Sequence, residues 1–242
     1  MGKKFLVLLV ILSILLVGCG GKTAEADVSG KLEPMTEPSA KQEEPAAEEE
    51  LPAETPVTMG RLEGGTYINE YTGYSCTLDS NWAFYGAEEL QELPDNVKEL
   101  LADTEIGDAM ESVTQFTDMM AENVNEMVTV NVLYQKISLQ ERLAFAMLSE
   151  SEIIDATLEQ QDSMIDAYAQ AGMNVDTIEK VTVTFLGEER TCLKTTGTMQ
   201  DIPFYILQVF DFQLGQYTVT LSVNSYTEDK TAQTLELFQP IN

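Results

Sequence analysis

The stretch 177-TIEKVTVTFLGEERTCLKTTGTMQDIPFYILQVFDFQLGQYTVTLSVN-224 decides the fold of this chain. It contains four runs rich in β-branched and aromatic residues, which are typical of β-strands, at 177–185, 189–199, 203–212 and 216–224. Gly187 and Gly215 lie between runs, at positions where hairpin turns favour residues that tolerate a positive φ. The stretch therefore predicts an antiparallel meander of four strands.

Further strands and helices are predicted before and after this meander. Tyr74, Cys76 and Leu78 alternate with polar residues, the period-two pattern of a half-buried strand. The turn-forming residues at 79–81 then predict a first hairpin, whose second strand begins at Trp82. Two more strands are expected at 112–119 and 127–134, and helices at 88–101, 139–148, 151–171 and 229–238. Together they predict an α+β fold, one antiparallel β-sheet flanked by helices.

The N-terminal residues are organised like a secretory signal. Lys3 and Lys4 precede the apolar run 5–17, which is shorter than the about 20 residues of a membrane-spanning helix. The run ends in Leu-Val-Gly before Cys19, which resembles the lipobox of bacterial lipoproteins. That resemblance implies a signal peptide at 1–18 and acyl chains such as palmitate on Cys19. The alternatives are an ordinary secretory signal with an incidental cysteine, or an uncleaved membrane anchor.

Residues 19–60 have a different composition from the rest of the chain. They include five prolines, the acidic run 48–50 and no aromatic residue. Such a segment buries too little apolar surface to fold, and proline and like charge both extend it. We therefore expect a disordered, acidic, proline-rich linker at 19–60 that carries the lipidated Cys19. One folded domain is expected at 61–242, held by the anchor on the extracytoplasmic side of the cell membrane.

Charge and composition restrict the function. The 13 basic and 41 acidic residues give a net charge of −28, and histidine is absent. Such a charge repels nucleic acid and anionic lipid headgroups, so we expect no nucleic-acid partner. Without histidine, Ser-His-Asp and Cys-His catalytic sites are excluded, and no GxSxG or phosphate-binding loop occurs. The sequence predicts no enzyme, no catalytic residue, no metal site and no cofactor.

Cys76 and Cys192 are the cysteines left once Cys19 is assigned to the anchor. Outside the cytoplasm a disulfide between them is permitted. Both lie in predicted strands, where buried thiols behave as small apolar side chains. We favour two free buried thiols, with the disulfide as the alternative.

A resemblance to a known family adds to this interpretation. The segment Tyr67-x-Asn69-x-Tyr71-x-Gly73-Tyr74-Ser75, followed by Leu78 and Trp82, resembles the entry to PsbP-like α/β/α-sandwich domains. The order of elements extends the resemblance over about 64–240. It implies a module that binds or assembles with another molecule, because known members of the family are mostly non-catalytic.

Two surfaces are candidate binding sites. An acidic face on the helix expected at 151–171 would suit a basic partner or weak calcium binding, although such faces are usually simply solvated; it comprises Glu152, Asp155, Glu159, Asp162 and Asp166. An aromatic cluster near the first hairpin could stack on sugars or peptides, although strand alternation would bury about half of it; it comprises Tyr67, Tyr71, Tyr74, Trp82 and Tyr85.

The sequence therefore predicts a membrane-anchored, extracytoplasmic lipoprotein. Its domain is expected to be a non-catalytic interaction or assembly module with a protein partner in the cell envelope. The alternative is a lipoprotein that binds a peptide, glycan or small molecule and presents it to a transporter. That alternative needs a pocket of several hundred Å³ with convergent polar groups. A hydrolase acting on the cell wall is a third possibility.

Overall fold

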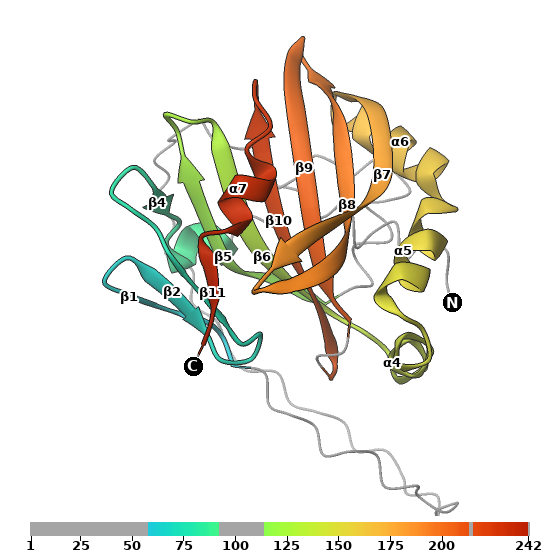
Figure 1. Ribbon diagram of the computed structural model, residues 1–242, viewed down its shortest axis with the longest axis horizontal. Coiled ribbons are helices and arrows are strands. Elements are labelled where there is room, and N and C mark those ends of the chain that lie inside the picture. Colours follow the sequence, from blue (N-terminus) through green and yellow to red (C-terminus); the bar gives the residue numbers. More distant parts are fainter. Residues whose placement is uncertain (1–57, 92–113, 213–214, 242) are drawn as a thin grey trace, which may run out of the picture.

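The computed structural model describes residues 58–91, 114–212 and 215–241. These residues form two antiparallel sheets (Figure 1). The seven-stranded sheet has the order β4 (Ala83–Phe84), β5 (Gln115–Asn123), β6 (Val128–Lys136), β10 (Tyr217–Tyr226), β9 (Ile202–Asp211), β8 (Glu188–Met199) and β7 (Met173–Phe185). The four-stranded sheet has the order β1 (Arg61–Glu63), β2 (Thr66–Asn69), β3 (Tyr74–Thr77) and β11 (Phe238–Pro240).

The four-stranded meander predicted from the sequence is confirmed as β7 to β10. Two-residue turns connect β7 to β8 at Leu186–Gly187 and β8 to β9 at Gln200–Asp201. All four turn residues have positive φ, between 52° and 85°. This is the hairpin geometry whose twist matches that of the flanking strands.

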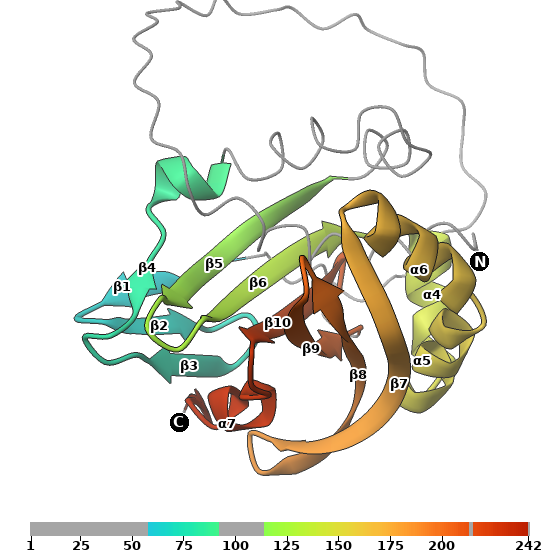
Figure 2. The same ribbon diagram turned by 90° about the horizontal axis from the view of Figure 1, so that it is seen from above.

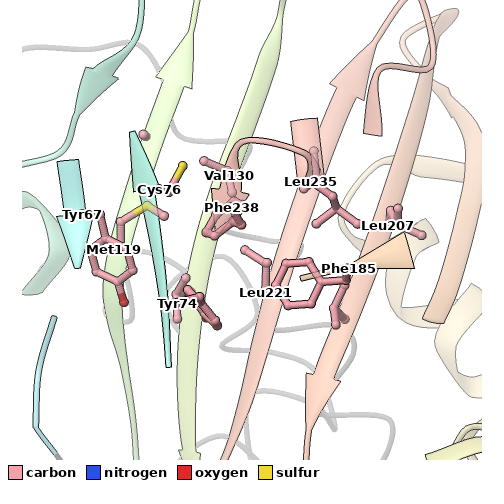
Figure 3. Packing of buried hydrophobic residues seen from close by; sticks show 14 of the residues in the cluster. Tyr67, Tyr74, Cys76, Met119, Val130, Phe185, Leu207, Leu221, Leu235 and Phe238 are labelled. Atoms are coloured by element: carbon pink, nitrogen blue, oxygen red, sulfur yellow. The ribbon is translucent and has the colours of Figure 1, made fainter. Parts of the chain in front are cut away.

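The seven-stranded sheet separates two apolar layers (Figure 2). One face is covered by α4 (Leu139–Ala146), α5 (Glu150–Leu158) and α6 (Gln161–Gln170). The other face packs against the four-stranded sheet and α7 (Thr231–Leu235), and Figure 3 shows part of this second cluster. The chain thus has an α+β fold in which strands dominate. The expectation of a single sheet was wrong, because residues before and after the main sheet form a second one.

The predicted first hairpin was also wrong in its pairing. The turn forms as expected, since the backbone N–H of Trp82 donates to the carbonyl of Asp79 at 3.1 Å. However, β3 pairs with β2 and β11, whereas β4 pairs with β5. The turn therefore passes the chain from one sheet to the other.

The single helix expected at 151–171 is two helices. The first ends at Leu158, the second begins at Gln161, and Gln160 between them has a non-helical φ of −112°. Neither proline nor glycine marks this break in the sequence. Gly172 follows the second helix with a φ of 78°, as predicted for a helix C-terminus.

The helix expected at 229–238 is shorter than predicted. It spans Thr231–Leu235, and the chain then returns to an extended conformation as β11. Phe238 lies opposite Cys76 of β3 and is almost completely buried. Burial of this ring between the two sheets favours the strand over continuation of the helix.

Several predictions fall on residues that the structure does not describe. They are the signal peptide at 1–18, Cys19, most of the linker at 19–60, most of the helix at 88–101 and the first residues of the strand at 112–119. Residues 88–91 are helical, as predicted. No helix of the described residues is long and apolar enough to span a membrane.

The expectation of buried thiols is confirmed. Cys76 of β3 and Cys192 of β8 are both free and fully buried in the cluster between the two sheets. Burial raises the pKa of each thiol to about 12, so both remain protonated at neutral pH.

Candidate functional site

A groove of about 650 Å³ lies between the C-terminal end of β7 and the segment formed by α7 and β11. The hairpin of β7 and β8 curves toward α7 and brings its turn close to the C-terminal residues (Figure 2). The groove is lined by Thr182, Val183, Thr184, Leu186, Gly187, Ala232, Leu235, Glu236, Phe238, Gln239 and Pro240. Its volume lies within the range of about 300–1,000 Å³ that is typical of ligand sites.

The first wall of the groove depends on an unusual turn residue. Leu186 has a φ of 54°, a left-handed conformation that normally favours glycine or asparagine. Its side chain is half-buried against the cluster between the sheets and also lines the groove. Such strain is found where the surroundings or a function hold a residue in place.

The second wall is fixed by Asp229, just before α7. Its Oδ1 accepts hydrogen bonds from the backbone N–H and the hydroxyl of Thr231, at 3.1 and 2.7 Å. Its Oδ2 accepts from Nζ of Lys194 on β8, at 2.5 Å. Burial alone would raise the pKa of Asp229, but these donors outweigh it and hold the pKa below its ordinary value. The carboxylate thus attaches the start of α7 to the seven-stranded sheet.

The lining of the groove mixes apolar and polar side chains. It combines apolar side chains with the hydroxyls of Thr182 and Thr184, the amide of Gln239 and a single charged group, the carboxylate of Glu236. Nowhere in the described part of the chain do three or more His, Cys, Asp or Glu side chains gather to hold a metal ion. Within the lining, Glu236 is therefore the one ionised group that could interact with a charged ligand.

The aromatic cluster is not one surface. Tyr67 and Tyr74 are each only 1% exposed and belong to the core between the two sheets. The ring of Tyr74 packs edge-on against Phe238 of β11, with centroids 5.4 Å apart. These two rings are therefore unavailable for stacking on a ligand. The other three members, Tyr71, Trp82 and Tyr85, are half-buried and pack against the cores.

A buried polar cluster of Gly60, Tyr67, Asn69 and Asp118, the Asp118 cluster, escaped sequence analysis. Asp118 lies at a bulge in β5, and its carboxylate accepts hydrogen bonds from the Tyr67 hydroxyl, the Asn69 amide and the Gly60 backbone. Burial raises the pKa of Asp118, although these donors oppose the shift. The carboxylate is only 8% exposed and its partners are internal. It therefore positions the four-stranded sheet and is closed to substrate.

The acidic face is divided between the two helices. All five carboxylates are exposed, but the break after α5 separates Glu152 and Asp155 from Asp162 and Asp166. Two of the five already have partners. Asp155 accepts a hydrogen bond from Nζ of Lys180 at 2.5 Å, and Glu152 completes a capping box with Ser149, which lowers its pKa. The face is therefore less continuous and less available than the sequence suggested.

The groove has no signature in the sequence. Its walls come from residues 182–187 and 232–240, which lie far apart in the chain and contain no binding motif. The alternation of threonine and valine in β7 is the one local signal, and it is common to most strands.

No protein-family model matches the chain, and a search of curated proteins finds no match.

Proposed function

We propose that this chain is a lipoprotein attached through Cys19 to the extracytoplasmic side of the cell membrane, and that its domain is a non-catalytic interaction module. The observation that carries the second part is the groove beside β7, whose lining mixes apolar side chains with hydroxyl, amide and carboxylate groups. In ligand sites, a few placed polar groups fix the orientation of the ligand and give specificity.

The distribution of buried titratable groups supports a non-catalytic role. The pKa values of Asp118 and Asp211 are raised, first of all by burial. Yet Asp118 is enclosed by Tyr67 and Asn69, and Asp211 is paired with Arg190. A group with a shifted pKa indicates a functional site when it lies in a cleft. Neither aspartate lines the groove.

We further propose that the domain is related to PsbP-like α/β/α sandwiches. The antiparallel main sheet and the layer of α4 to α6 on one of its faces support this relationship. On the other face, the four-stranded sheet occupies most of the position that a helical layer would take in such a sandwich. This sheet is the main departure from the proposed architecture.

The lipid anchor is tested by changing Cys19 to serine in the full chain. Cells are labelled with radioactive palmitate and separated into membrane and soluble fractions. The wild-type protein should carry the label and sediment with membranes, because two or more acyl chains give stable anchoring. The Cys19→Ser variant should lose the label. Equal labelling of the two proteins would contradict the proposal.

The interaction module is tested by blocking the groove. Ala232 of α7 is exposed in the lining, so Ala232→Arg fills the groove without removing a buried contact. A membrane protein that cross-links to the wild-type chain in cells should be lost with Ala232→Arg. It should be retained when Asp162 and Asp166 of the acidic face are changed to asparagine. Loss with the acidic-face variant alone would contradict the assignment of the groove.

The groove volume also supports a second candidate function, presentation of a small ligand to a transporter. A small molecule that raises the melting temperature of the wild-type chain but not of Ala232→Arg would favour it, because ligands that bind only the folded state stabilise that state.

A further inference from the structure

The edge of β7 offers unpaired backbone groups to the groove. Among the described residues, β7 is the last strand of the seven-stranded sheet and pairs only with β8. The two-residue turn makes Phe185 and Glu188 a hydrogen-bonded pair, and such pairs recur at every second residue, next at Val183. The intervening residues, Thr182 and Thr184, therefore direct their N–H and C=O groups away from β8.

These outward groups have no partner within the described residues. The backbone of Thr182 and Thr184 makes no hydrogen bond to a turn, loop, cap or side chain there. Both residues are exposed and line the groove. A row of unpaired backbone donors and acceptors at a sheet edge is a template for another strand.

The opposite wall of the groove is closed to such pairing. The backbone N–H of Ile241 donates to the carbonyl of Gly73, at 2.9 Å. Because hydrogen-bonded pairs alternate along β11, the backbone N–H and C=O groups of Gln239 point toward β3. The backbone groups of Phe238 and Pro240 point toward the free side of the strand. Pro240 has no N–H, and proline is one of the features that protect exposed edges. An added strand can therefore pair with β7 but not continuously with β11.

The side chains around this edge indicate what such a strand contains. Val183 and Leu186 are half-buried and present apolar surface, as does Ala232 across the groove. Small apolar side chains at alternate positions of an added strand would contact them. Glu236 is the only charged lining residue, on a chain with a net charge of −28. Basic residues at the ends of the strand complement this charge.

We infer that the groove binds an extended peptide segment of a partner protein, which adds to the seven-stranded sheet beside Thr182 and Thr184 of β7. The segment alternates small apolar and polar residues and carries lysine or arginine near Glu236. This inference rests on the proposed function and specifies the partner as an unstructured, neutral to basic segment. Strand addition of this kind draws affinity from backbone hydrogen bonds and specificity from alternate side chains.

The probe is a synthetic peptide of alternating valine and threonine with a lysine at each end. Its binding to the full chain in detergent is followed by fluorescence polarisation. The wild-type chain should bind it, and should not bind the same peptide N-methylated at alternate residues, which lacks the pairing N–H groups. A wild-type chain that binds neither peptide, or both equally, would overturn the inference.

The decisive variant is the double change Thr182→Pro and Thr184→Pro. Proline is tolerated at an edge where the N–H points outward, so the β7–β8 ladder should persist. Two lost backbone hydrogen bonds should weaken peptide binding by about tenfold or more. The matched control, Thr182→Val with Thr184→Val, keeps both N–H groups and should bind like the wild type. Equal binding by the proline variant, with an unchanged melting temperature, would overturn strand addition.

A variant that leaves the strand intact guards against a folding defect. Glu236→Lys should weaken binding of the lysine-flanked peptide and strengthen binding of a glutamate-flanked one. No reversal between the two peptides would overturn the charge assignment. If the proline variant no longer binds the peptide but still cross-links to its membrane partner, the proposed interaction module stands. The inference that the partner binds through an alternating peptide segment is then overturned. A wild-type dimer that the prolines dissociate would identify a second copy as the occupant and overturn the inference.

Discussion

The phenol of Tyr67 donates a hydrogen bond of 2.5 Å to the carboxylate of Asp118, and this contact connects the two sheets. Tyr67 belongs to β2 of the four-stranded sheet, and Asp118 lies at the bulge of β5 in the seven-stranded sheet. The same carboxylate also accepts hydrogen bonds from the backbone N–H of Gly60, just before β1. The bulge thus supplies the polar group that positions the four-stranded sheet.

We predict that Asp118→Asn destabilises the domain and changes its pH dependence. The amide can accept fewer of the three donors, which should lower the free energy of unfolding by about 1–3 kcal/mol at neutral pH. Burial raises the folded pKa of Asp118 above its ordinary value of 3.8, so the folded state binds the proton more tightly. The group therefore contributes stability below that ordinary pKa and loses it as the pH rises through the folded pKa.

Urea denaturation from about pH 4 to about pH 7 measures both effects, because this range begins at the ordinary pKa of a carboxyl group. The difference in unfolding free energy between wild type and Asp118→Asn should change across the acidic part of the range. Asp162→Asn, at an exposed position of α6, is the control and should follow the wild type. Parallel pH profiles for wild type and Asp118→Asn would show that the pKa of Asp118 is not raised in the folded state.

We predict that Arg190 holds α5 against the sheet. Its guanidinium donates to Glu150 at 3.0 and 2.8 Å, and to Asp211 at 3.1 Å. Arg190→Gln should lower the free energy of unfolding by about 2 kcal/mol, because two poorly solvated carboxylates lose their partner. Lys230→Gln, which removes an exposed pair with Glu126, should cost less than about 1 kcal/mol. Equal losses in urea denaturation would argue against the structural role of Arg190.

The thiols of Cys76 and Cys192 should be unreactive in the folded protein. Burial raises the pKa of each to about 12, and the thiolate is the reactive form. A thiol reagent at neutral pH should label the Cys19→Ser chain slowly in buffer and fully in urea. Rapid labelling in buffer would show that the cluster between the sheets is open.

Leu186→Asn should separate stability from binding. Asparagine tolerates the left-handed φ of 54°, which costs leucine about 1–2 kcal/mol, but it loses the apolar contact. The two effects nearly offset each other, so the free energy of unfolding should change by less than about 1 kcal/mol. Binding of the alternating valine–threonine peptide should weaken, because the groove loses apolar surface. Unchanged peptide affinity would mean that Leu186 has no part in the site.

Local patterns predicted the elements whose partners are close in the chain. The four strands of the meander were predictable because runs rich in β-branched and aromatic residues, with Gly187 and Gly215 between them, indicate antiparallel neighbours. The helix expected at 139–148 forms at Leu139–Ala146 and is capped by Ser138. Alternation also identified the buried side of β3, where Tyr74 and Cys76 lie.

Long-range pairing determined the parts that were missed. β11 forms because Phe238 finds a place opposite Cys76, more than a hundred residues earlier in the chain. No proline or glycine in the sequence indicates the break at Gln160. After the break, Ile165 is exposed whereas Met164 is buried. The groove depends on both the hairpin and β11, so no local pattern could have predicted it.

We propose that partners dock beside β7 rather than on the acidic face. The most direct test places a photo-activated cross-linking residue at Leu186 in the groove, or at Asp162 on α6, in the full chain in cells. We expect a discrete protein adduct from position 186 that the valine–threonine peptide competes away, and none from position 162. An adduct from position 162 alone would contradict the claim.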